Sequence, residues 1–183
     1  MKKFVLIKFA SLAVAGLLSQ GAFAQDGRIN FTGDIVDAPC SVAPASQNLN
    51  VPLGRVSRTA FTGAGTKSTP ALFKIELLNC GASAKGAAVT FSGTNDLVDP
   101  TNLRVANAGQ VGGPGGTGVA ATGVAIEIGD SAGTKIPLGS PSADYILGLG
   151  DNALNFRAAY VATTAAVTTG PANSTAQFTI AYK

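Results

Sequence analysis

The sequence contains no histidine and no tryptophan among its 183 residues, and only 13% of the residues are charged. Without histidine the chain has no imidazole to act as the base of a Ser-His-Asp or Cys-His nucleophile, or as the usual ligand of a catalytic zinc ion. Most familiar hydrolase chemistry is therefore excluded. The low charge and the many Thr, Ala and Gly residues favour paired strands over salt-bridged helices, so the first prediction is an all-β protein with one ordinary core.

The first 24 residues have the features of a secretory signal peptide. Two lysines precede an apolar stretch, Phe4–Leu18, and the sequence AFA at residues 22–24 is a small-x-small cleavage site. A membrane anchor is the alternative, but the uninterrupted apolar part is about half of the roughly 20 residues that a spanning helix needs. We expect cleavage after Ala24, which leaves 159 of the 183 residues.

Removal of this leader changes the charge of the chain. The leader takes away three of the 13 basic residues, so that ten basic and ten acidic residues remain. The basic balance of the whole chain is thus a property of its leader. Because the remaining Lys and Arg residues stand singly rather than in clusters, we expect no nucleic-acid partner.

Two cysteines, Cys40 and Cys80, remain after cleavage. An even number of cysteines in an oxidising compartment predicts one disulfide, and two free thiols are the alternative. A bridge closing a loop of about 40 residues would stabilise the fold by roughly 4 kcal/mol in the chain-entropy model. The spacing is not Cys-x-x-Cys, so we expect no redox catalysis.

Short segments with apolar residues two apart recur along the exported chain, separated by Gly, Pro, Asn, Asp and Ser. This pattern is typical of half-buried strands joined by turns, and no long amphipathic helix accompanies it. Nine short strands in one domain favour a β-sandwich or a barrel. The predicted strands are Arg28–Val36, Leu49–Val56, Ala71–Leu78, Ala87–Ser92, Leu103–Ala106, Gly123–Ile128, Asp144–Leu147, Ala153–Ala162 and Thr175–Tyr182.

The remaining motifs do not point to a chemical site. Residues 107–118, NAGQVGGPGGTG, predict a mobile surface loop, and the G-x-G-x-x-G pattern inside it lacks the following helix that a dinucleotide site needs. Asp96 and Asp99 have the pattern of turn residues, whereas Glu127 and Asp130 flank a strand end. An acid–base pair among these carboxylates is the only enzymatic alternative. We predict that the protein is not an enzyme, with no catalytic residue, no cofactor and no metal.

The segment before Cys40 has an unusual apolar face. If it is extended, Gly33 interrupts the row of apolar side chains, which weakens a strand but allows another backbone or side chain to approach closely. The other face is polar, with Arg28, Asn30, Thr32 and Asp34. The row itself consists of Ile29, Phe31, Gly33 and Ile35.

The last predicted strand alternates in the same way. Its apolar positions are Ala176, Phe178, Ile180 and Tyr182, and it ends one residue before the last residue, Lys183. Such a strand leaves open which element pairs with its far edge.

These two ends resemble the major pilus subunits that Gram-negative bacteria assemble by the chaperone–usher route, of the type 1 fimbrial kind. A glycine fourteen residues from the end and a penultimate tyrosine belong to the family pattern, and Gly170 and Tyr182 occupy those places. The long Gly-rich loop departs from the pattern. The matching pieces are the leader, INFTGDIVDAPC at residues 29–40, LLNC at 77–80, NFRAAYVAT at 155–163 and FTIAYK at 178–183.

The resemblance implies an incomplete immunoglobulin-like β-sandwich that is completed by a donor strand from another subunit. It divides the chain into a signal peptide at 1–24, a donor-strand extension at 25–38 and a pilin domain at 39–183. In the extension, the donated row would be Ile29, Phe31, Gly33 and Ile35. The acceptor and chaperone-binding edge would consist of Gly170, Ala176, Phe178, Ile180 and Tyr182.

The resemblance also implies partners and a location. These are other copies of the same subunit joined head to tail, a periplasmic pilus chaperone and an outer-membrane usher, with export through the periplasm to a surface fimbrium. The alternative is a minor fimbrial adaptor or a secreted carbohydrate-binding adhesin module. Sugars usually stack on aromatic rings, and Tyr145, Tyr160 and Tyr182 are the only tyrosines in a chain without tryptophan.

Overall fold

A computed structural model describes residues 29–33, 39–106 and 119–183 of the chain. The chain divides into two units, with the boundary between Val36 and Asp37. The predicted leader, residues 25–28 and 34–38 of the extension, and the Gly-rich loop with its G-x-G-x-x-G pattern lie outside the described residues. Within the described part, no helix is long and apolar enough to cross a membrane.

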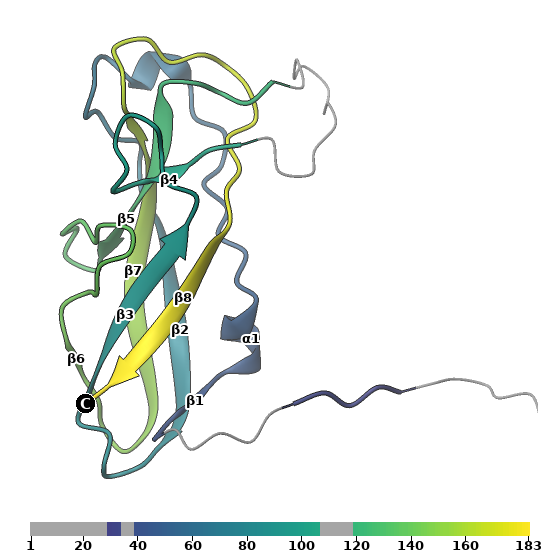
Figure 1. The fold of residues 1–183 in the computed structure, drawn as a ribbon, viewed down its shortest axis with the longest axis vertical. Coiled ribbons are helices and arrows are strands. Elements are labelled where there is room, and N and C mark those ends of the chain that lie inside the picture. Colours follow the sequence, from purple (N-terminus) through teal and green to yellow (C-terminus); the bar gives the residue numbers. More distant parts are fainter. Residues whose placement is uncertain (1–28, 34–38, 107–118) are drawn as a thin grey trace, which may run out of the picture. The chain divides into compact units, whose positions relative to one another are not determined.

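The strands of the second unit form two antiparallel sheets (Figure 1). One sheet has the order β1-β2-β7-β5-β4, and the other has the order β6-β3-β8. The predicted β-sandwich, rather than a closed barrel, is therefore confirmed. The strands are β1 (Ser41–Val42), β2 (Ala71–Cys80), β3 (Gly86–Gly93), β4 (Leu103–Arg104), β5 (Val124–Asp130), β6 (Tyr145–Ile146), β7 (Gly150–Ala162) and β8 (Ala176–Tyr182).

The core lies between the two sheets. Alternate residues of each strand point inward, so that a period of two in the sequence becomes one apolar layer. The ring of Phe156 on β7 stacks on Phe73 of β2 at 5.5 Å and meets Phe91 of β3 edge-on at 5.1 Å between centroids. Around these rings, the most deeply buried aliphatic side chains come from both sheets: Ile75, Leu77, Val89 and Leu154.

A disulfide joins Cys40 to Cys80, with 4.2 Å between the two Cα atoms. It ties the start of the sandwich to the last residue of β2, next to the short pairing of β1 with β2. The predicted bridge is confirmed, and both cysteines are buried.

The predicted strand Leu49–Val56 is wrong. Residues 48–56 form no strand, and after Asn48, which caps α1, their backbone makes no hydrogen bond to another described backbone group. Pro52 has no N–H to donate, and Gly54 takes a left-handed φ of 73°, so a regular ladder is interrupted twice.

The ends of the other elements were predicted closely, but three short elements were not predicted. Seven of the predicted strands correspond to β2–β8 within a few residues, whereas Ile29–Gly33, the described part of the first predicted strand, carries no strand. The unpredicted elements are β1, the four-residue helix α1 (Pro44–Gln47) and the 3-10 turn η1 (Arg58–Ala60).

The connection between β7 and β8, residues 163–175, packs closely against the residues that precede β5. Ala121 donates its N–H to the Pro171 carbonyl at 2.9 Å, and Thr168 donates to the Thr122 carbonyl at 3.1 Å. A Cβ on Gly170 would lie 2.4 Å from the Val119 oxygen and 2.7 Å from the Ala121 nitrogen. Only glycine permits this approach of two backbones.

We therefore predict that Gly170→Ala destabilises the domain by roughly 1–3 kcal/mol, because the added methyl group can only be accommodated by moving backbone. The measurement is the free energy of unfolding in urea. Gly63→Ala is the matched control, since a Cβ on Gly63 meets nothing within 4 Å and its φ is not left-handed. Equal unfolding curves for the two variants would contradict the packing argument.

Candidate functional site

Strand β8 is paired on one side only. It pairs with β3 from Gly93↔Ala176 to Ala87↔Tyr182, and within the described ranges no strand lies along its other side. The inward-facing residues Phe178, Ile180 and Tyr182 are half-buried, whereas Val89 and Phe91 on the neighbouring β3 are buried. A strand with unpaired backbone groups along one side and half-exposed apolar side chains lacks a neighbouring strand.

A second unpaired backbone edge faces the same space. It is the segment 48–56, between α1 and η1, whose backbone groups after Asn48 have no backbone partner among the described residues. Val51, Leu53 and Val56 of this segment are half-buried, and the residues between them are exposed. We call residues 48–56 the wall segment.

The wall segment and β8 border an open groove with a volume of about 1740 Å³. Its floor is the sandwich core, where Phe73, Phe91 and Ile126 line it. Further lining comes from the β7–β8 connection, including the Gly170 that packs on residues 119–121. An apolar floor between two free backbone edges suits one extended peptide, whose N–H and C=O groups can pair on both sides.

The structure places the predicted acceptor residues in two groups. Gly170, Ala176 and Phe178 line the groove, although Gly170 belongs to the β7–β8 connection rather than to the strand. Ile180 and Tyr182 lie further along β8 and pack against the core. The Tyr182 hydroxyl donates to the Cys40 carbonyl at 3.5 Å, and burial raises the pKa of this hydroxyl.

The predicted donor row lies partly outside the described residues. Ile29 and Phe31 are 78% and 91% exposed, and Gly33 has open space around it, whereas Ile35 is not described. Sequence reasoning missed the wall segment as a part of the site. Its alternating apolar residues were the available signal, but that pattern predicted a paired strand.

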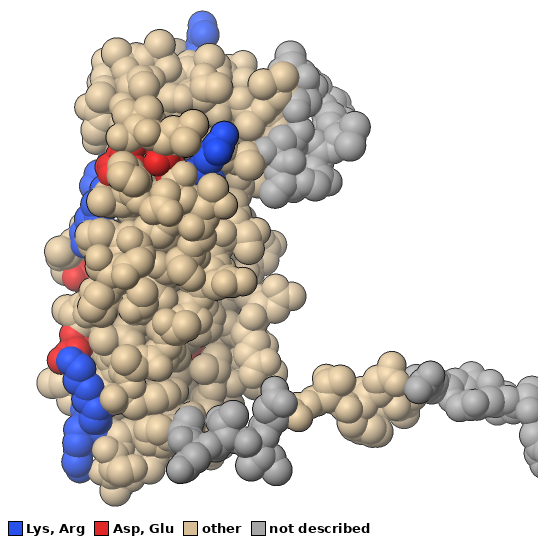
Figure 2. All heavy atoms as spheres, viewed as in Figure 1, with Lys and Arg blue, Asp and Glu red and all other residues tan. Residues whose placement is uncertain are grey.

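The surface around the sheet β6-β3-β8 carries little charge. Figure 2 shows charged side chains along the left margin, in a band across the upper part of this face and at the top, while most of the remaining described surface there is uncharged. Like Tyr182, the other two tyrosines bind backbone carbonyls through their hydroxyl groups. The Tyr145 hydroxyl donates to the Asn155 carbonyl at 3.0 Å, and the Tyr160 hydroxyl donates to the Ala172 carbonyl at 2.9 Å.

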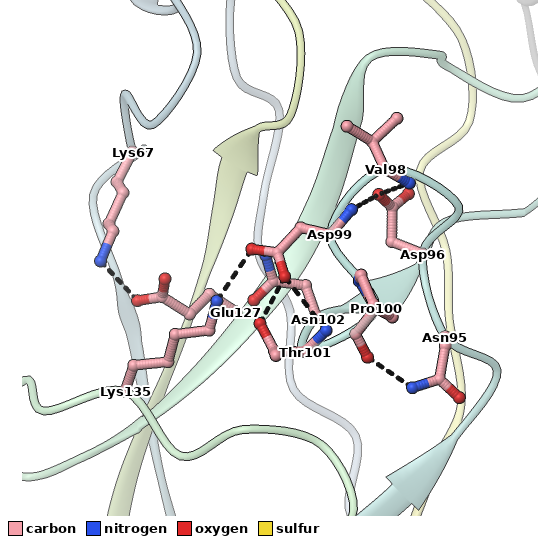
Figure 3. Close-up of polar contacts among 10 residues, drawn as sticks. All are labelled: Lys67, Asn95, Asp96, Val98, Asp99, Pro100, Thr101, Asn102, Glu127 and Lys135. Atoms are coloured by element: carbon pink, nitrogen blue, oxygen red, sulfur yellow. Dashed lines mark hydrogen bonds and ion pairs between the residues drawn. The ribbon is translucent and has the colours of Figure 1, made fainter.

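The carboxylates considered for acid–base chemistry bind neighbouring groups (Figure 3). Asp96 accepts the N–H groups of Val98 and Asp99, each at 3.0 Å, which is a turn cap as predicted. Asp99 accepts from Thr101, from the Asn102 amide at 2.9 Å and from the Lys135 ammonium at 3.0 Å. This network ties the β3–β4 connection to the residues that follow β5.

The other two carboxylates, Glu127 and Asp130, bind different partners. Glu127 points to Lys67, with 2.5 Å between the carboxylate oxygen and Nζ, and is 9% exposed. Asp130 accepts the Thr134 N–H at 2.8 Å, a hydrogen bond that lowers the pKa of its carboxyl. Among the described residues no three His, Cys, Asp or Glu side chains gather as metal ligands would.

The hydrogen bonds from Thr101 and Lys135 lower the pKa of Asp99 below its ordinary value of 3.8. A carboxyl whose pKa is lower in the folded state stabilises the fold above its unfolded pKa and loses this effect as the pH falls through the folded value. We predict that Asp99→Asn lowers the free energy of unfolding by about 1 kcal/mol at neutral pH. The difference from the parent protein should shrink once the pH falls below 3.8.

Urea unfolding of both proteins from neutral to acid pH measures this convergence. If the difference in free energy of unfolding between the two proteins stayed constant down to the lowest pH, the ionised Asp99 carboxylate would not be the source of the stabilisation.

The chain is similar over its full length to fimbrial proteins. It is 37% identical to Long polar fimbria protein A of Salmonella typhimurium, over 100% of this chain and 98% of that protein. It is also 37% identical to the probable major fimbrial subunit LpfA of Escherichia coli O157:H7, with the same coverage.

Solved structures share the fold. A Burkholderia pseudomallei antigen and type I fimbria protein is 40% identical with a TM-score of 0.59, covering 84% of this chain and 96% of that one. A subunit of a chaperone–usher pilus is 28% identical with a TM-score of 0.67 over 87% and 96%. The P pilus rod subunit PapA is 27% identical with a TM-score of 0.62 over 80% and 100%.

The family model described as "Fimbrial protein" matches residues 29–183, which include both borders of the groove and the described extension. The relatives named above are fimbrial and pilus subunits, and the chain shares the immunoglobulin-like sandwich of the solved pilus subunits. The chain therefore belongs to the fimbrial protein family and is a structural pilin.

Proposed function

We propose that the pilin polymerises head to tail by donor-strand exchange, in which the extension 25–38 of one copy fills the groove of another. The observation that carries this proposal is the groove between two unpaired backbone edges over an apolar floor. An inserted strand would add main-chain hydrogen bonds on both sides and place alternate side chains on the floor.

In this proposal the donated row is Ile29, Phe31, Gly33 and Ile35. The high exposure of Ile29 and Phe31 supports it, since two large apolar side chains without cover gain roughly 1.5–3 kcal/mol each when they are buried. Gly33 would face a place in the groove where the acceptor leaves no room for a side chain.

The acceptor edge comprises Gly170, Ala176, Phe178, Ile180 and Tyr182. Phe178, Ile180 and Tyr182 offer a half-buried apolar face, and the free side of β8 offers the backbone groups of a strand. Gly170 holds the connection that lines one end of the groove against residues 119–121.

The contact is heterologous, because the extension of one copy meets the groove of the next, and it does not close on itself. Such contacts generate open filaments. A filament of this kind is the fimbrium in which a structural pilin of this family serves.

An open groove is an aggregation hazard before assembly, because it exposes an apolar floor and two unpaired edges. We infer that a periplasmic chaperone covers it first, after the leader has directed export and been cleaved behind Ala24, and that an outer-membrane usher supervises the exchange. The domain division at 1–24, 25–38 and 39–183 follows from the same proposal.

We predict that deletion of Gln25–Asp37 abolishes fibres while the domain still folds and still binds the chaperone. The reason is that the deletion removes the donor but leaves the groove intact. Negative-stain electron microscopy and SDS-resistant ladders measure polymerisation, and co-purification measures chaperone binding. Unchanged fibres from the deleted chain would refute the proposal.

The matched variant moves the donor instead of deleting it. Residues 26–38, attached behind Lys183 through a short Gly-containing turn to the deleted chain, should fold back into its own groove and give a stable monomer. A monomer that melts no higher than the deleted chain would show that the segment does not fit the groove.

We also predict that Gly33→Leu slows polymerisation at least tenfold, because in the proposed joint the acceptor approaches the donor backbone closely at Gly33, and a side chain there must displace it. The growth rate of SDS-resistant oligomers measures this. Thr32→Val is the control, since residue 32 is on the opposite face of an extended segment and its variant should grow at the parent rate. If the Gly33→Leu chain formed oligomers at the parent rate, a close approach at Gly33 would be refuted.

A further inference from the structure

The groove has a charge signature of its own. Of all the described residues that line it, the only charged ones are Arg55 and Arg58. Both are exposed, and neither has a carboxylate within 4.0 Å among the residues that the structure describes. The remaining lining is apolar or neutral, so the groove border carries two positive charges and no compensating acid.

The two arginines mark one end of the groove. The wall segment runs from α1 to η1, and Arg55 and Arg58 lie at the η1 end. The other end of the groove is fixed by the hydrogen bond between Tyr182, at the end of β8, and Cys40, which precedes β1 and α1. Because β8 ends at the Tyr182–Cys40 contact, the arginines at the η1 end of the wall segment lie near the end of the groove where β8 begins.

The extension has the opposite charge, also placed unevenly. Residues 25–38 contain three aspartates and one arginine, which gives a formal charge of −2. Asp34 and Asp37 stand at its C-terminal end, whereas Arg28 stands nearer its start. In an extended segment Asp34 falls on the face opposite the apolar row, and Asp37 lies beyond Ile35, the last residue of that row, so neither belongs to the row that would cover the groove floor.

We propose that Arg55 and Arg58 form a cationic border that recognises Asp34 and Asp37 of the incoming extension and thereby sets which end of that extension lies beside η1. This inference rests on the proposed donor-strand exchange and adds its specificity determinants. Opposite charges on neighbouring strands stabilise a pairing, and like charges oppose it.

The charge balance of the chain favours a local mechanism of this kind. Residues 25–183 carry ten basic and ten acidic residues, so net charge neither attracts nor repels another copy. A local match between a border of charge +2 and an extension of charge −2 then discriminates the correct end during encounter. The same match discriminates against a basic or uncharged strand, because such a strand leaves both arginines without a partner.

A charge swap in the full-length pilin tests this proposal, because every joint contains one extension and one border. Arg55→Glu with Arg58→Glu, or Asp34→Lys with Asp37→Lys, places like charges together at every joint. Each double variant should form SDS-resistant oligomers roughly tenfold more slowly than the parent at low ionic strength. The chain with all four substitutions restores opposite charges and should recover most of the parent rate.

Salt and a distant charge provide the controls. In about 1 M salt, where the screening length is about 3 Å, the double variants should approach the parent rate. Lys85→Glu reverses a charge outside the groove lining and should leave the rate unchanged. Circular dichroism of each variant establishes that it is folded.

The outcomes separate the two proposals. Slow double variants without recovery in the fourfold chain would overturn the pairing of these arginines with these aspartates, and so would double variants that polymerise at the parent rate. If the chain without Gln25–Asp37 still forms fibres, donor-strand exchange itself fails, whatever the charge variants do.

Discussion

The backbone groups along the free side of β8 are the constraint on which the rest of this structure depends. A central strand of a sandwich has hydrogen-bonded neighbours on both sides, but β8 has one, and after Asn48 the wall segment opposite it has no backbone partner among the described residues. The burial of the side chains follows the same pattern as the hydrogen bonding. Val89 and Phe91 on β3, which has a strand on each side, are buried between the two sheets. Phe178 and Ile180 on the neighbouring β8 are only half-buried.

Such a groove tends to collapse unless its borders are held apart, and several features of the fold hold them. The disulfide and the Tyr182–Cys40 hydrogen bond fix one end. The close backbone packing of Gly170 on residues 119–121 fixes the connection at the other end. Pro52 and Gly54 keep the wall segment from forming a regular ladder, so that it does not close onto β8.

Much of this architecture is predictable from alternation alone. The strands β2, β7 and β8 carry apolar residues two apart over long stretches, and the inward faces of β2 and β7 bury residues that the pattern indicates, whereas those of β8 are half-buried. The short elements are not predictable in this way. A two-residue strand such as β1 or a single turn such as η1 depends on tertiary contacts rather than on a sequence period. The contact between Asp99 and Lys135, which joins two distant connections, likewise leaves no periodic signal in the sequence.

The wrong prediction for Leu49–Val56 differs from these omissions, because the pattern there is present and only the pairing is absent. Alternation records which side chains must be buried, but it does not record which chain supplies the neighbouring strand. The described part of the extension, residues 29–33, shows the complementary case, since Ile29 and Phe31 have strand-like spacing and remain exposed. If the two segments become neighbours in the fibre, both patterns are satisfied at once. The alternating patterns then describe the joint between two subunits, whereas in a single chain the acceptor segment is unpaired and the donor side chains are exposed.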